Sequence, residues 1–175
     1  MDKKLESDIS RYGGNKNSLP KFQKYFRKYQ AANNRVKKIV YKILFVINRK
    51  KNFIEIAADA KIGYGLYIGH PFAITINPDV IIGNNCNIHK GVTIGQENRG
   101  KKKGVPIIGD DVWIGINSTI VGKIKVGNDV LIAPNSYVNF DVPDHSIVIG
   151  NPGKIIPNVH ATKDYINNKF INNQN

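Results

Sequence analysis

Aliphatic residues recur at every sixth position through the middle of the chain. The longest unbroken series has six members: Ile108, Ile114, Ile120, Val126, Ile132 and Val138. A helix repeats at about 3.6 residues and an alternating strand at about 2, so neither element alone produces this spacing. A glycine or another small residue follows most of these aliphatics. The pattern predicts a solenoid of short strands, in which one aliphatic side chain per strand points into a shared core.

The same period extends towards the N-terminus, with one slip of two residues between two series: Ile62, Ile68 and Ile74, then Ile76, Ile82, Ile88 and Ile94. About twelve six-residue units predict roughly four triangular coils within residues 54–157. The period breaks between Ile94 and Ile108, where residues 96–105 are polar, charged and rich in glycine. This segment predicts a loop that projects from one corner of the solenoid. Cys86 falls at a small buried position of the repeat, so we interpret it as a core residue.

Before residue 54 the pattern changes to helical spacing. Residues 3–10 predict a short helix, and two apolar stripes follow: Phe22, Tyr25, Phe26 and Tyr29, then Val36, Ile39, Val40, Ile43, Leu44 and Ile47. Two interpretations of these stripes stay open. The favoured one packs both stripes on the body of the protein, and the other places the helix pair at an anionic membrane surface. Residues 158–175 predict a polar tail with at most one short helix.

Charge separates the two parts of the chain. The net charge is +13, and residues 1–60 carry 15 Lys or Arg against 5 Asp or Glu. No nucleic-acid-binding motif accompanies this basicity, so we expect no nucleic-acid partner. One cysteine excludes an internal disulfide. No segment resembles a signal peptide, and the run 39–47 is too short to span a bilayer, so we expect a cytoplasmic protein.

Four motifs along the repeat resemble those of the hexapeptide-repeat acetyltransferases, and among them the serine acetyltransferases: Gly69-His70, then residues 88–95 (IHKGVTIG), 106–115 (PIIGDDVWIG) and 141–154 (DVPDHSIVIGNPGK). The opening Asp8-x-x-Arg11-Tyr-Gly-Gly14 resembles the shorter members associated with surface-polysaccharide synthesis. The resemblance implies a mainly β protein. It would have a left-handed parallel β-helix over 54–157, a basic helical segment over 1–53 and a tail over 158–175.

The resemblance also implies an enzyme that transfers the acetyl group of acetyl-CoA to a hydroxyl, as a homotrimer and with no metal. It places the general base at His70, a role that suits a neutral imidazole. Without that resemblance, a lone histidine in a repeat is more often structural. His89 is interpreted as a wall of the pocket, and His145 and His160 receive no chemical role.

For the acetyl-CoA side, the resemblance implies a row of contacts on successive coils. It places Gly95 and Gln96 near the thiol end, and Lys154 near a phosphate of the nucleotide. Four further residues would line the pantetheine arm: Gly115, Ile116, Ala133 and Pro134. The alternative interpretation is that the glycines only make turns.

Three departures from the family put the acceptor in question. Gly69 stands where serine acetyltransferases carry Asp, Val105 stands where they carry a second His, and residues 1–53 are shorter than their helical domain. The carboxylate that orients His70 is not identified, with Glu55 and Asp79 as weak candidates. We therefore expect a saccharide acceptor from capsule or O-antigen synthesis, near a membrane or carrying phosphates. L-serine is the alternative, and a non-catalytic β-helical binding module is a third reading.

Overall fold

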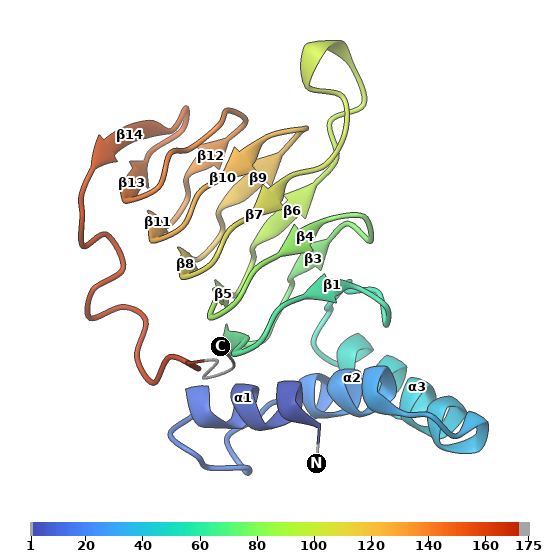
Figure 1. Cartoon of the computed structure of the whole chain (residues 1–175). Helices are drawn as coiled ribbons and strands as arrows, with labels where there is room; N and C mark the ends of the chain where they lie inside the picture. Colours follow the sequence, from blue (N-terminus) through green and yellow to red (C-terminus); the bar gives the residue numbers. More distant parts are fainter. Residues whose placement is uncertain (1, 172–175) are drawn as a thin grey trace.

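The computed structural model describes residues 2–171 and shows a left-handed parallel β-helix with three helices at its N-terminal end (Figure 1). Each coil contributes a strand to each of three flat sheets. Sheet 1 contains β1 (Lys61–Ile62), β4 (Ile81–Ile82), β7 (Ile107–Ile108) and β10 (Lys125–Val126). Sheet 2 contains β2 (Tyr67–Gly69), β5 (Asn87–His89), β8 (Val112–Ile114), β11 (Val130–Ile132), β13 (Ser146–Ile149) and the antiparallel β14 (Lys154–Pro157). Sheet 3 contains β3 (Thr75–Ile76), β6 (Thr93–Gly95), β9 (Thr119–Val121) and β12 (Tyr137–Val138).

The aliphatic residues at spacing six form the core. All six members of the longest series are at most 1% exposed, and Ile88 and Ile94 are fully buried. Each such side chain contributes about 2 kcal/mol through apolar area removed from water. Cys86 is also fully buried, and burial raises the pKa of its thiol to about 12. The prediction that Cys86 is a core residue is confirmed.

The number of coils differs from the prediction. The structure has five levels rather than four, because the chain pairs with the solenoid before and after the repeat. Glu55 bridges to Thr75 in parallel below sheet 3, and Val142 bridges to Val126 above sheet 1. These residues join through backbone hydrogen bonds, which do not require the six-residue aliphatic spacing.

Helices α1 (Lys3–Arg11) and α2 (Lys21–Ala31) close the open end of the solenoid below the first coil. The fully buried Asp8 carboxylate accepts hydrogen bonds from Arg27 Nε at 2.8 Å and from the Leu66 amide at 2.9 Å. Phe22 and Phe26 of α2 are buried in the core, as the favoured interpretation of the first apolar stripe predicts. The Asp8-x-x-Arg11 motif therefore ties the helices to the coil.

Helix α3 (Arg35–Lys50) does not pack as predicted. Its buried residue is Phe45, which lies 5.8 Å from the ring of Phe26. The stripe itself remains in solvent, with Ile39 51% and Ile43 53% exposed. Packing of the second apolar stripe on the body of the protein was thus the wrong expectation, because α3 contacts α2 through its other side. No helix of the described residues is long and apolar enough to cross a membrane.

The spacing of residues did not predict where the tail packs. From residue 158 to residue 171 it forms no helix and lies along the outer face of sheet 2. Tyr165 packs edge-on against Trp113, with ring centroids 5.1 Å apart, and Ala161 and Ile166 are buried. Outward-facing Trp113 and Leu131 supply an apolar surface that the tail covers.

Candidate active site

The predicted site residues lie at two different corners of the solenoid. Strands of sheet 2 end at the corner that leads into sheet 3, where successive coils place His70, Lys90, Ile116 and Pro134 in one column. Strands of sheet 3 end at the corner that leads into sheet 1, where Gly95 and Gln96 lie. From Lys90 to Gly95 the chain turns at Gly91 and then crosses the width of sheet 3 through β6. One copy of the chain therefore does not bring Gln96 against His70.

His70 follows β2 in a left-handed turn with φ of 54°, and its side chain is exposed. The neighbouring histidine on the next coil has a different environment. His89 is half-buried against Trp113, with ring centroids 4.6 Å apart, and its Nδ1 lies 3.0 Å from the Ile114 carbonyl oxygen. Because a carbonyl only accepts, Nδ1 carries the proton and Nε2 of the neutral ring is an acceptor. Burial lowers the pKa of His89.

The side chain of His89 limits what can stand at position 69 on the coil below. Gly69 pairs directly with His89 across the parallel ladder. A Cβ atom at position 69 would lie 2.4 Å from His89 Cδ2 and 2.6 Å from its Nε2. The imidazole of His89 thus occupies the volume that any side chain at position 69 would need. With the ring in this position, only glycine fits at position 69.

The glycines predicted to contact acetyl-CoA differ in what the fold requires of them. A Cβ at Gly115 would lie 2.6 Å from the Pro134 nitrogen, so packing of the next coil already demands glycine there. The amides of Gly115 and Ala133 donate to Ile132 and Val148, so the ladder uses both N–H groups. At Gly95, by contrast, a Cβ would meet Val121 at an ordinary 3.5 Å. The fold of one chain therefore gives no steric reason for glycine at position 95.

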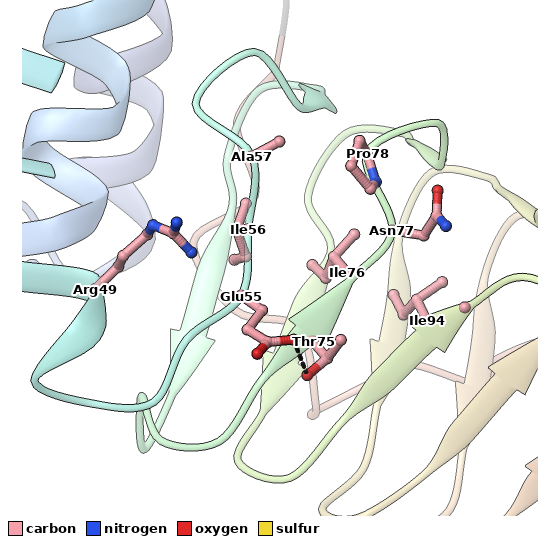
Figure 2. Close-up of a pocket in the computed structure, with 10 residues that line it drawn as sticks. Arg49, Glu55, Ile56, Ala57, Thr75, Ile76, Asn77, Pro78 and Ile94 are labelled. Atoms are coloured by element: carbon pink, nitrogen blue, oxygen red, sulfur yellow. Dashed lines mark hydrogen bonds between the residues drawn. The ribbon is translucent and has the colours of Figure 1, made fainter. Parts of the chain in front are cut away.

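Gly95 borders an open pocket of about 560 Å³ on the outer face of sheet 3 (Figure 2). Glu55 lies in this pocket, where its carboxylate accepts a long hydrogen bond from Thr75 Oγ1 at 3.5 Å. Arg49 reaches in from the end of α3, and its Nη1 donates to the Ile54 carbonyl at 3.1 Å. Asp79, the other candidate carboxylate, is exposed beyond the far end of β3 from His70.

The remaining predicted residues lie higher on the solenoid. Ala133 and Pro134 border a groove of about 460 Å³ between sheet 2 and the tail. Lys154 is exposed at the start of β14, and the preceding Gly153 donates to the Tyr137 carbonyl at 2.9 Å, which fixes the segment on the last coil. Among the described residues, no three His, Cys, Asp or Glu side chains gather to hold a metal.

The sequence did not indicate that Arg49 would line the pocket beside Gly95. It also did not indicate a smaller pocket beside His89. That second pocket, of about 310 Å³, is lined by Arg11, Tyr67, Asn87 and Trp113 together with the tail. Asn87 and His89 alternate with the buried Ile88, so outward-facing polar residues in β5 were the available signal.

The loop over residues 96–105 projects from the sheet 3–sheet 1 corner (Figure 1). Glu97 and Gly104 close its base by two reciprocal backbone hydrogen bonds of 2.9 Å. A 3₁₀ turn, Gly100–Lys102, forms its tip. Three consecutive lysines, 101–103, concentrate positive charge near the tip of the loop.

Comparison with known proteins agrees with the fold and with the repeat. The family described as "Bacterial transferase hexapeptide (six repeats)" matches residues 106–139. A serine acetyltransferase of Staphylococcus aureus is 37% identical over 123 residues, which cover 70% of this chain and 58% of the relative. One from Staphylococcus epidermidis is 43% identical over 103 residues, covering 59% of this chain and 48% of the relative. The chain thus spans about half the length of the curated relatives it matches.

Solved structures extend the similarity to the fold. The serine acetyltransferase of Neisseria gonorrhoeae, crystallised in complex with serine, superposes with a TM-score of 0.66 at 27% identity. The match covers 87% of this chain and 67% of that one. By its repeat, its β-helix and these similarities, the chain carries a hexapeptide-repeat β-helix that resembles those of the serine acetyltransferases.

Proposed function

We propose that the chain is an acetyl-CoA-dependent O-acetyltransferase in which His70 is the general base. The names of its relatives support the reaction type, and the exposure of His70 at the edge of sheet 3 supports the residue. The observation that carries most weight is Gly95, which borders the Figure 2 pocket although the fold does not demand a glycine there. A narrow pantetheine arm needs such a bare stretch of backbone. The co-substrate agrees with the cytoplasmic location expected from the sequence.

The reaction requires little from the chain besides position and proton transfer. The imidazole of His70 takes the proton of the acceptor hydroxyl as the hydroxyl oxygen attacks the thioester carbonyl. The tetrahedral intermediate collapses, the C–S bond breaks, and the thiolate of CoA leaves and takes up a proton. Holding both reactants beside His70 supplies much of the rate increase.

The division of the site between two corners supports assembly into a homotrimer. His70 and Gly95 lie on opposite edges of sheet 3, so the corner of one copy must meet the other corner of a neighbour to complete the site. Flat sheets with exposed aliphatics such as Ile81 and Ile107 offer surface for such contact. We propose that acetyl-CoA binds in this groove, from Gly95 and Gln96 towards Lys154.

For the acceptor, the similarity to serine acetyltransferases favours L-serine over the saccharide expected from the sequence. A saccharide stays the second candidate because Gly69 and Val105 stand where the resemblance implies an aspartate and a histidine. His89 fills the space that a side chain at position 69 would need. Arg49 suits either one: its guanidinium forms no ion pair among the described residues and lies in the Figure 2 pocket opposite Glu55. A carboxylate or a phosphate on the acceptor would match that charge.

Release of CoA thiol, measured with L-serine and separately with nucleotide-linked sugars, tests the proposal. We expect turnover with one of these acceptors and a fall in kcat of about 100-fold or more in His70→Ala. His145→Ala is the matched control, because His145 is exposed at the opposite end of sheet 2 and bonds to Asp129 at 2.8 Å. Full turnover in His70→Ala would refute the assigned base. Absence of turnover together with no CoA binding at millimolar concentration would establish the non-catalytic reading.

A second pair of variants distinguishes the residues that bind acetyl-CoA from those that bind the acceptor. Gly95→Ala places a methyl group in the proposed path of pantetheine and is expected to raise the KM for acetyl-CoA. Arg49→Gln is expected to raise the KM for the acceptor while leaving the KM for acetyl-CoA nearly unchanged. The reverse pattern would contradict the assignment of the pocket.

A further inference from the structure

Helix α3 presents an aliphatic stripe to solvent along most of its length. Five residues form the stripe and are each 45% or more exposed: Val36, Ile39, Val40, Ile43 and Ile47. Isolated exposed aliphatics are ordinary, but five on one helix form a contiguous patch that marks an interaction site. The helix has 16 residues and is therefore about 24 Å long.

The geometry of the helix shows that the stripe is not a misplaced core face. At about 100° per residue, the five aliphatics fall within an arc of about 100°. Phe45, nine positions after Val36, points about 180° away and is 1% exposed. α3 is thus anchored to the body of the protein by one side and presents the opposite side outward. Figure 1 shows it at the N-terminal end of the solenoid, far from the last coils.

Charge limits what can cover this stripe. The helix contains six basic residues and no acidic one: Arg35, Lys37, Lys38, Lys42, Arg49 and Lys50. Arg35 and Lys42 flank the stripe on one side and Lys37 on the other, at about 100° to 120° from its centre. Cations beside an aliphatic stripe match a surface with anionic groups above an apolar layer.

We propose that α3 lies in the plane of an anionic membrane surface, with its stripe buried at the boundary of the headgroups and acyl chains. The proposal does not depend on acetyl transfer. A second copy of α3 is a poorer occupant, because pairing the stripes would bring twelve like charges together with no acid on either helix. A helix of this length with a polar basic flank lies on a membrane and does not cross it.

Co-sedimentation of the full chain with vesicles tests the proposal. We expect binding to vesicles of phosphatidylglycerol and phosphatidylcholine, weak binding to phosphatidylcholine alone, and weakening by 0.5 M NaCl. Replacing Ile39 and Ile43 by Ser is expected to lower the partition coefficient at least about tenfold. Replacing Lys37 and Lys42 by Glu, a second variant that leaves the stripe intact, is expected to abolish the preference for anionic lipid.

The matched controls lie outside α3, on the last strand of the solenoid and on the loop over residues 96–105. Ile155 and Ile156 of β14 are 37% and 47% exposed, so their replacement by Ser removes similar side chains. Replacing Lys101 and Lys103 of the loop by Glu makes the same charge change. Equal loss of binding in these controls would overturn the proposal. So would absence of binding to anionic vesicles, or a change in oligomeric state of the Ile39 and Ile43 variant, which would identify the stripe as a contact between copies.

Discussion

The contact between Gly69 and His89 makes a sharp prediction for the variant Gly69→Ala. The added methyl would lie 2.4 Å from His89 Cδ2, well inside van der Waals contact, so the imidazole must move. Backbone strain does not contribute, because Gly69 has no left-handed φ. The cost therefore arises at His89 and is absent when that ring is removed.

The structure sets the expected magnitude. Moving the ring breaks the bond from His89 Nδ1 to the Ile114 carbonyl, about 1 kcal/mol, and the contact with Trp113, about 1 kcal/mol. Alanine is favoured over glycine in a strand by about 0.5 kcal/mol, which offsets part of this loss. We expect Gly69→Ala to lower the free energy of unfolding by about 1.5 kcal/mol.

Urea unfolding at fixed protein concentration measures this change, in the wild-type background and in His89→Ala. In His89→Ala the same methyl is expected to be neutral or slightly stabilising, giving a coupling energy of about 2 kcal/mol between the two positions. Gly95→Ala is the control, because its Cβ makes only the 3.5 Å contact with Val121. An equal loss of stability from Gly69→Ala with and without His89 would refute the steric argument.

Three further predictions follow from the buried groups. The pKa of His89 is lowered below its ordinary 6.5, so its contribution to stability is complete above pH 6.5 and declines as pH falls below that value. The free energy of unfolding in urea should therefore differ less between pH 7.5 and pH 5.5 in His89→Gln than in the wild type. Asp8→Ala leaves Arg27 buried without its partner, which should cost about 3 to 5 kcal/mol in thermal or urea unfolding, against less than about 0.5 kcal/mol for the exposed Asp79→Ala. Cys86 should not react with a thiol reagent in the native protein and should react fully in urea, because burial keeps its thiol protonated and inaccessible.

Residues that face into the solenoid were predictable. The period of six located Ile88, Ile94 and Ile114 in the core, and the frame slip after Ile74 matches the corner before β3. A short helix was expected over residues 3–10, where α1 lies, and the apolar spacing from residue 21 onwards predicted helical structure where α2 lies. These features depend on residues close together in the chain, where the repeat imposes one inward position per strand.

Residues that face outward were not predictable from spacing. The tail lies on sheet 2 because Trp113 and Tyr165 meet, and Arg11 reaches the carbonyl of Asn167, across more than 150 positions of sequence. The glycine at position 69 makes sense only beside His89, 20 residues away. Neither partner carries a periodic signal that identifies the other.

By itself, then, the sequence determined the β-helix, its aliphatic core and the family that it resembles, because these depend on a local repeat and on short motifs. Only the tertiary structure decided how the candidate site is distributed and which apolar faces remain uncovered. His70 and Gly95 each come one or two residues after an aliphatic of the repeat, Ile68 or Ile94, yet they lie on opposite edges of sheet 3. The stripe of α3 has the periodicity of a core face, but only the placement of Phe45 against α2 shows that it points into solvent.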